Sequence, residues 1–370
     1  MSKIRRALGL MSGTSLDGID LALIETDGAD HVRRIGAASI AYPDDFRARL
    51  RGALAEARSI THRSERPGTL ADVERELTER QAAACMTFLA DQALQPSAVD
   101  VIGFHGQTVL HKPDVGLTVQ LGDGALLADL TAIDVVYDLR AADMAAGGEG
   151  APLAPAYHRA LAAKVPQRPV ALLNIGGVAN ITWIDADGTL IAFDTGPGNA
   201  LIDDLIQRTT GRSHDMDGQL AASGICDERV LHAYLMHPYF AKAVPKSLDR
   251  NAFPPELVEG LSPADAAATL TAFTVEAIVK AREHVPAEPA LWVVCGGGRR
   301  NRTLMSGLAG QVEAAVVPAE ALGLDGDTLE AEAWAYLAVR SLAGLAISYP
   351  RTTGVPRAMT GGVLARAFAR

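Results

Sequence analysis

The chain has 370 residues, a length at which one hydrophobic core usually gives way to two, so two domains are expected. Hydrophobic residues make up 48% and charged residues 21%, and no apolar run reaches the ~20 residues that span a bilayer, which excludes a membrane protein. A net charge of -10 without acidic blocks disfavours a nucleic-acid surface. The N-terminus lacks the apolar stretch of a secretory signal, and three scattered cysteines suit neither a disulfide framework nor structural zinc, so we expect a reduced, cytoplasmic protein.

The first half of the chain begins with alternating strands and turns. Three β-rich segments predict a three-stranded meander at residues 7–11, 19–26 and 35–42. Helical spacing and short apolar runs then predict helices at 44–57, 72–94 and 121–130, a strand at 99–106 that ends in a polar turn, and a strand at 132–139.

The second half repeats this plan with different residues. We predict strands at 170–175, 182–184, 189–196 and 290–298, and helices at 198–211, from Ser262 onward, at 299–310 and at 328–345. In each half, a strand, a glycine turn and a returning strand precede αβ units. This indicates a duplicated α/β unit, divided near 165–169 into lobes 1–165 and 166–370, with the C-terminal segment free to cross back, and a ligand cleft between the lobes.

Four glycine-rich turns each follow an apolar strand: MSGTSLDGID, NIGGVAN, FDTGPGN and VCGGGRRN. Any one of them is more often a simple strand ending, but four together favour a site where backbone amides and the hydroxyls of Ser12, Thr14 and Ser15 hold phosphate. No Gly-Lys pair and no G-x-G-x-x-G occurs, which excludes a Walker loop and a dinucleotide fingerprint. Asp17, Asp20 and Asp194 suit magnesium, directly or through water, and equally suit turns.

Seven motifs in this order resemble the signature series of anhydro-N-acetylmuramic acid kinases, a family of the sugar-kinase, heat-shock-protein and actin superfamily. They are LGLMSGTSLDGID, GFHGQTVLH, DLRAADMAAGGEGAPLAP, NIGGVANIT, FDTGPGN, CGGGRRN and LEAEAWAYLA, between about Leu8 and Gly362. The resemblance implies two duplicated ribonuclease-H-like lobes, the actin-like ATPase fold, around a nucleotide cleft.

The resemblance also implies roles for individual residues. Asp194 matches the catalytic carboxylate, and Glu330 matches the acidic residue of the family pattern K-E-A-x-A-F-A, here with Leu329 for lysine and Trp334 for phenylalanine. The implied ATP-binding residues are Gly13, Thr14, Ser15, Leu16, Asp17, Gly18, Ile19, Asp20, Gly176, Gly177, Gly196, Gly198, Asn199, Gly296, Gly297, Gly298 and Asn301. The expected substrate-binding residues are His105, Gln107, Thr108, Arg140, Asp143, Asn174 and Glu330, while Asp17 and Asp20 are expected to hold Mg²⁺ through water.

The implied reaction is ATP + 1,6-anhydro-N-acetylmuramic acid + H₂O giving N-acetylmuramic acid 6-phosphate + ADP, a step of peptidoglycan recycling and amino-sugar metabolism. Because the departing O6 can attack the γ-phosphorus, one carboxylate suffices, as the base for the water that attacks C1. Two alternatives stay open: a kinase for another sugar, and a non-catalytic ATP-dependent binding module.

Local alternatives stay open as well. His105 is either a substrate ligand or a structural hydrogen-bonder, and Arg140 and Asp143 either meet the lactyl carboxylate and sugar hydroxyls or pair with each other. The spaced histidines do not form a zinc site. The expected partner is a small anhydro amino sugar, with no nucleic acid or membrane, and the sequence leaves both a monomer and a homodimer open.

Overall fold

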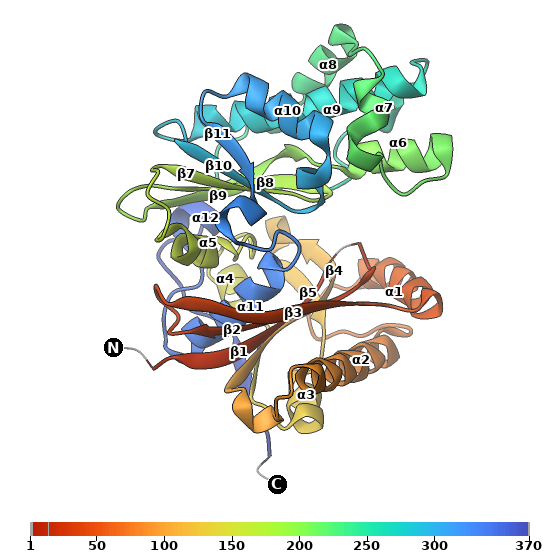
Figure 1. Cartoon of the computed structure of the whole chain (residues 1–370). Coiled ribbons are helices and arrows are strands. Elements are labelled where there is room, and N and C mark those ends of the chain that lie inside the picture. Colours follow the sequence, from red (N-terminus) through yellow and green to blue (C-terminus); the bar gives the residue numbers. More distant parts are fainter. Residues whose placement is uncertain (1–2, 14, 369–370) are drawn as a thin grey trace. The chain divides into compact units, whose positions relative to one another are not determined.

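The computed structural model describes residues 3–13 and 15–368, which belong to two compact units (Figure 1). Unit 1 comprises Met1–Lys164 and Thr328–Arg370, and unit 2 comprises Val165–Asp327. The chain thus enters unit 2 at Val165 and returns to unit 1 at Thr328, so the second unit ends well before residue 370. Within the described residues, no helix combines the length and apolar character needed to cross a membrane.

Unit 1 is built on a seven-stranded sheet in the order β12-β6-β4-β1-β2-β3, with β5 paired to β4. Its strands are β1 (Arg5–Ser12), β2 (Gly18–Thr26), β3 (Val32–Ala41), β4 (Val101–Lys112), β5 (Leu117–Leu121), β6 (Val135–Tyr137) and β12 (Val363–Ala365). The predicted meander is confirmed, since β1, β2 and β3 pair antiparallel in sequence. Strand β1 also pairs parallel with β4, and β4 with β6, which makes the sheet mixed.

Helices cover both faces of this sheet. One core joins it to α1 (Asp44–Glu56), α2 (Leu70–Asp91) and α3 (Gly124–Thr131), and α11 (Leu329–Leu342) lies on the opposite face (Figure 1). The shorter helices are α4 (Ala141–Ala145), α5 (Pro155–Ala162) and α12 (Pro350–Thr353). A Cβ on Gly9 or Gly103 would overlap a backbone carbonyl of α11, so these glycines let the helix lie directly on β1 and β4.

One prediction in unit 1 is wrong. The strand predicted at 99–106 was expected to end in a polar turn, but β4 continues to Lys112 and pairs with β5, a strand that was not predicted. Backbone pairing across the Gly116 turn extends the strand, and Val109 and Leu110 pack in the core while the flanking Thr108 and His111 are more exposed.

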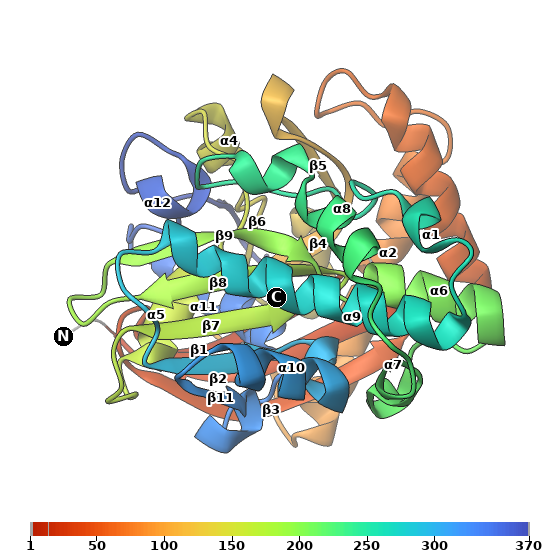
Figure 2. The same cartoon turned by 90° about the horizontal axis from the view of Figure 1, so that it is seen from above.

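Unit 2 contains a five-stranded sheet in the order β11-β10-β7-β8-β9. Its strands are β7 (Val170–Ile175), β8 (Val178–Ile184), β9 (Leu190–Pro197), β10 (Leu291–Cys295) and β11 (Ala315–Pro318). Its helices are α6 (Ala200–Thr210), α7 (Gln219–Ala222), α8 (Glu228–Leu235), α9 (Pro263–Lys280) and α10 (Arg302–Gln311). Helix α9 crosses one face of the sheet (Figure 2), and the predicted cap is confirmed because Ser262 accepts from Asp265 N at 3.1 Å. Strand β8 begins four residues earlier than predicted, directly after the glycine turn.

The two sheets have the same topology. Taken from the third strand of each meander, the orders are β3-β2-β1-β4-β6 and β9-β8-β7-β10-β11. In both, the meander is antiparallel and the last two strands are parallel to the first. The duplication predicted from the sequence is therefore confirmed: each unit is a ribonuclease-H-like α/β fold.

Candidate active site

The turn after β1 is fixed by buried hydrogen bonds. Ser12 Oγ donates to Gln107 Oε1 (2.6 Å) and accepts from the Tyr42 hydroxyl (3.0 Å). Gln107 Nε2 in turn donates to Gly13 O (3.1 Å). The Gln107 amide, expected to bind substrate, therefore holds the predicted phosphate turn. Thr14, expected to bind ATP, lies outside the described residues.

The two acids of this turn are held by serine hydroxyls. Ser15 Oγ donates to Asp17 Oδ1 (2.7 Å), and Ser39 Oγ donates to Asp20 Oδ1 (2.5 Å). Asp17 is exposed and Asp20 is half-buried. Leu16, between Ser15 and Asp17, has a left-handed backbone conformation (φ 56°). No set of three or more His, Cys, Asp or Glu in the described ranges could enclose a metal. The expectation that Asp17 and Asp20 hold Mg²⁺ through water stays a prediction.

Two glycine turns of unit 2 interlock. Asn199 Nδ2 donates to Ile175 O (3.1 Å) and to Gly176 O (3.2 Å), and Gly198 N donates to Gly177 O (2.9 Å). A Cβ on Gly198 would overlap the Gly176 carbonyl, which explains the glycine. The two turns form one backbone surface at the N-terminus of α6, where the helix dipole favours an anion.

The third glycine turn of unit 2 is locked by an arginine. Arg299 Nη1 donates to Gly296 O (2.9 Å) and to Asp327 Oδ1 (2.9 Å), and its Nε donates to Glu320 (2.8 Å). The hydrogen bond that Arg299 donates to Asp327 is the main reason that the pKa of Arg299 is raised. Gly296 has a left-handed backbone (φ 73°). Asn301, expected at the nucleotide, caps α10 by accepting from Leu304 N at 3.0 Å.

Asp194 lies near the carboxyl end of β9 and is half-buried. Its Oδ2 accepts from Leu248 N (2.8 Å), its backbone N donates to Lys246 O (3.0 Å), and its backbone O accepts from the Tyr239 hydroxyl. The register of β8 and β9 shifts immediately beyond Asp194, where Thr195 is the extra residue. Such a bulge redirects side chains at the end of a strand. The segment around Leu248 and this bulge together fix the direction of the carboxylate.

A cationic group in unit 1 lies between β4 and α11. Arg140 Nη2 hydrogen-bonds to His105 Nε2 (3.1 Å), Arg140 Nη1 donates to Gly150 O (2.8 Å), and the guanidinium lies 5.2 Å from the Trp334 ring centre. The His105 ring also contacts Trp334, with 4.6 Å between centres. Burial, followed by the Arg140 charge, lowers the pKa of His105 to about 3, so this histidine is neutral and serves as an acceptor. Thr108 Oγ1 lies 3.4 Å from its Nε2.

Arg140 is not paired with Asp143 as one alternative proposed. Asp143 is buried and accepts from Gly150 N (2.7 Å) and from Thr353 Oγ1 (2.6 Å), so it secures the 148–150 loop. Burial lowers the pKa of Arg140 to about 10, and its Nε is buried without a hydrogen-bond partner. The guanidinium therefore has the environment of a site for an anionic ligand.

The two acids at the start of α11 differ in their surroundings. Glu332 is buried and bonded to Arg34, Tyr157 and Thr328, so it is structural. Glu330 is exposed. Burial lowers the pKa of Arg140, and the negative charge of Glu330 partly offsets this effect by raising it. The position implied by the family pattern is thus the acid that remains accessible.

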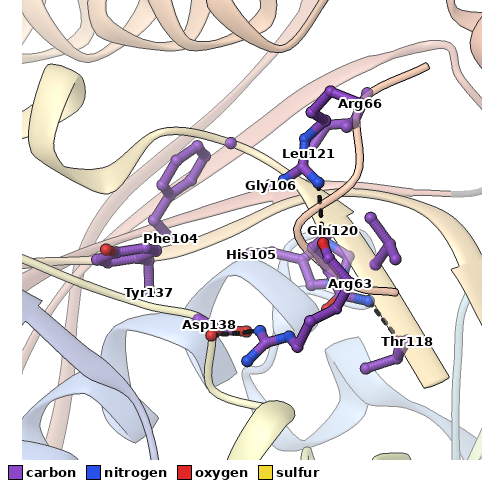
Figure 3. A pocket seen from close by; sticks show the side chains of 12 residues that line it. Arg63, Arg66, Phe104, His105, Gly106, Thr118, Gln120, Leu121, Tyr137 and Asp138 are labelled. Carbon is purple, nitrogen blue, oxygen red and sulfur yellow. Dashed lines mark hydrogen bonds and ion pairs between the residues drawn. The ribbon is translucent and has the colours of Figure 1, made fainter. Parts of the chain in front are cut away.

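A pocket of about 100 Å³ opens in unit 1 where β4 and β6 diverge (Figure 3). His105 and Gln120 line it from the β4-β5 hairpin, and Arg63 faces Asp138 across it in an ion pair of 2.5 Å. Its volume suits a few waters or one small polar group. Arg63 has no sequence signal of its own beyond its residue type, because loop closure brings it to this pocket.

Two ribonuclease-H-like units with glycine turns at the carboxyl ends of their central strands define the actin-like fold of ATPases and sugar kinases. The family model for anhydro-N-acetylmuramic acid kinase matches residues 5–367. An anhydro-N-acetylmuramic acid kinase from Brucella canis is 51% identical over 372 residues, covering 99% of this chain and 100% of the relative. One from Rhodopseudomonas palustris is 53% identical over 366 residues, covering 97% and 99%. The chain belongs to the anhydro-N-acetylmuramic acid kinase family.

Proposed function

We propose that this protein uses ATP and water to convert 1,6-anhydro-N-acetylmuramic acid into N-acetylmuramic acid 6-phosphate and ADP. Membership of the family supports the kinase reaction and its substrate. The structural observation that carries the mechanism is Asp194, a half-buried carboxylate aimed by Leu248 N at the end of a strand. The expected cytoplasmic location and the choice between monomer and homodimer stay predictions.

In the proposed reaction, the C1–O6 bond breaks as water adds to C1 and O6 takes the γ-phosphoryl group. Asp194 accepts one proton from that water and later releases it to solvent. The electron pair of the broken bond stays on O6 and forms the new P–O bond, while the β-γ bond breaks and ADP leaves. Water must attack from the face opposite the bridge, so the first product is the α anomer.

Phosphate binding is proposed for the glycine turns. Gly176, Gly177 and Gly198 offer backbone surface beside the α6 N-terminus, and the turn after β1 would contribute backbone amides. Such donors favour phosphoryl transfer by position and charge alone. Asp17 and Asp20 would hold Mg²⁺ through water, and the ion would neutralise charge on the phosphates.

Sugar binding is proposed for the group around Arg140. Its half-buried guanidinium, without a paired carboxylate among its hydrogen-bond partners, fits the lactyl carboxylate. Neutral His105 and accessible Glu330 would accept from hydroxyl or amide groups. This assignment predicts a preference for the anhydro sugar that carries the lactyl group.

The Asp194→Asn variant tests the proposed function. The amide oxygen can still accept from Leu248 N, so we expect ATP binding to be retained, while loss of the base lowers kcat roughly 10²- to 10⁴-fold. ADP release would be followed with the anhydro sugar and with ordinary amino sugars. Near-normal turnover of the variant would refute the base assignment, and stronger turnover of an ordinary amino sugar by the wild type would indicate a kinase for another sugar.

A further inference from the structure

Three polar side chains form a row across the unit 2 sheet. Asn174 on β7 pairs with Asn180 on β8, which pairs with Asp194 on β9. All three are half-buried, although the strand residues beside them are buried. Their neighbours Leu173, Ile175, Ala179, Ile181 and Phe193 belong to the core under one face. Because successive side chains alternate, the row lies on the opposite face.

The duplication gives this row a counterpart in unit 1. Met11, Asp20 and Ser39 are likewise paired across β1, β2 and β3. Their strand neighbours Leu10, Ile19 and Ile40 pack in the unit 1 core, so this row shares the corresponding strands and the corresponding face with Asn174, Asn180 and Asp194. Asn180 therefore lies on the strand and face of unit 2 that correspond to those of Asp20, which lies beside the predicted phosphate turn. The motifs single out the acid in unit 1 but not the asparagine in unit 2.

Asn180 differs from its counterpart in its bonding. Asp20 accepts from the Ser39 hydroxyl on the next strand. The Asn180 amide makes no side-chain hydrogen bond within the described chain, although Asp194 is directly opposite. Opposed residues on antiparallel strands have Cβ atoms about 5 Å apart, which leaves room for one water molecule between an amide and a carboxylate.

We propose that Asn180 is a further catalytic residue that holds the attacking water beside Asp194. The water would donate one hydrogen bond to the Asp194 carboxylate and accept one from Asn180 Nδ2, which leaves its second lone pair for C1. As Asp194 takes the proton, the amide keeps the oxygen in line with the C1–O6 bond. This inference rests on the proposed function, because it needs Asp194 as the base.

The test compares Asn180→Ala and Asn180→Asp in the full chain. Alanine removes the hydrogen-bond donor, so kcat should fall roughly ten- to a hundredfold, while KM for ATP stays within about twofold. The midpoint of the acidic limb in the pH profile of kcat should stay where it is in the wild type. Aspartate places a second carboxylate beside Asp194, so the acidic limb should move up by about one to two pH units. Two ionisable residues contact the Asp194 backbone. The Tyr239 hydroxyl donates to Asp194 O, and Lys246 O accepts from Asp194 N, while the Lys246 ammonium faces His284 and the Tyr239 carbonyl.

Two controls separate the possible failures. Asn251→Asp makes the same chemical change in an exposed loop and should leave the pH profile unchanged. Thermal unfolding shows whether each variant is folded. If Asp194→Asn is inactive but folded Asn180→Ala keeps kcat within about twofold of wild type, the inference fails while the proposed function stands. An unmoved acidic limb in Asn180→Asp would equally overturn it, and an active Asp194→Asn would overturn the base itself.

Discussion

Replacement of Arg140 by methionine tests the sugar site most sharply. Methionine keeps the length and apolar stem of the side chain but removes the two hydrogen bonds and the charge over Trp334. A charge-assisted bond to a ligand carboxylate contributes about 1.5 to 3 kcal/mol. Its loss should lower kcat/KM for the anhydromuramic sugar roughly 10- to 150-fold.

The informative quantity is a ratio of specificities. We would measure ADP release with 1,6-anhydro-N-acetylmuramic acid and with 1,6-anhydro-N-acetylglucosamine, which lacks the lactyl group. Wild type should prefer the first sugar, and Arg140→Met should lose most of that preference. Arg80→Met is the matched control, since its guanidinium lies 4.6 Å from the Phe46 ring and pairs with Glu76 on α2. Equal loss on both sugars, with the preference intact, would refute the carboxylate assignment.

Two further predictions concern stability. Gly103→Ala places a Cβ against the Trp334 carbonyl and should lower the free energy of unfolding, measured by urea denaturation, by about 1 to 3 kcal/mol. Gly52→Ala, which has open space around it in α1, should raise the free energy of unfolding by up to about 1 kcal/mol. An unchanged stability of Gly103→Ala would contradict the close packing of α11 on β4. Burial lowers the pKa of His158 to about 4, so below about 6.5 the unfolded chain binds a proton that the folded chain does not, and stability should fall as the pH drops from 6.5 to 4. His158→Gln should flatten this slope by up to about 1.4 kcal/mol per pH unit, and an unchanged slope would show that His158 is protonated in the fold.

The sequence predicted the architecture because its signals are local. The glycine turns, the apolar strand lengths and the Ser262 cap all act within a few residues, and they were enough to reveal the duplication. The β5 strand was missed because it is only five residues long and is stabilised by pairing with the extended end of β4.

The candidate site could be predicted only in part. Motifs named Asp194 and the glycine turns, but not the partners that the fold supplies, such as Leu248 for the carboxylate and Arg299 for the Gly296 turn. The family pattern selected Glu330 rather than Glu332, but only packing shows the physical difference, because Glu332 is buried in an ion pair with Arg34. Asn180 became visible only through the strand register.

The most direct test of the reaction is a mass-spectrometric assay with ATP, 1,6-anhydro-N-acetylmuramic acid and ¹⁸O-labelled water. The product should be the 6-phosphate with one ¹⁸O at C1 and none in its phosphate group, because water attacks carbon while O6 attacks phosphorus. Early quenching, and a control in which finished product is incubated in labelled water, correct for anomeric exchange. Label in the phosphate, or labelled inorganic phosphate released beside unchanged anhydro sugar, would contradict the account.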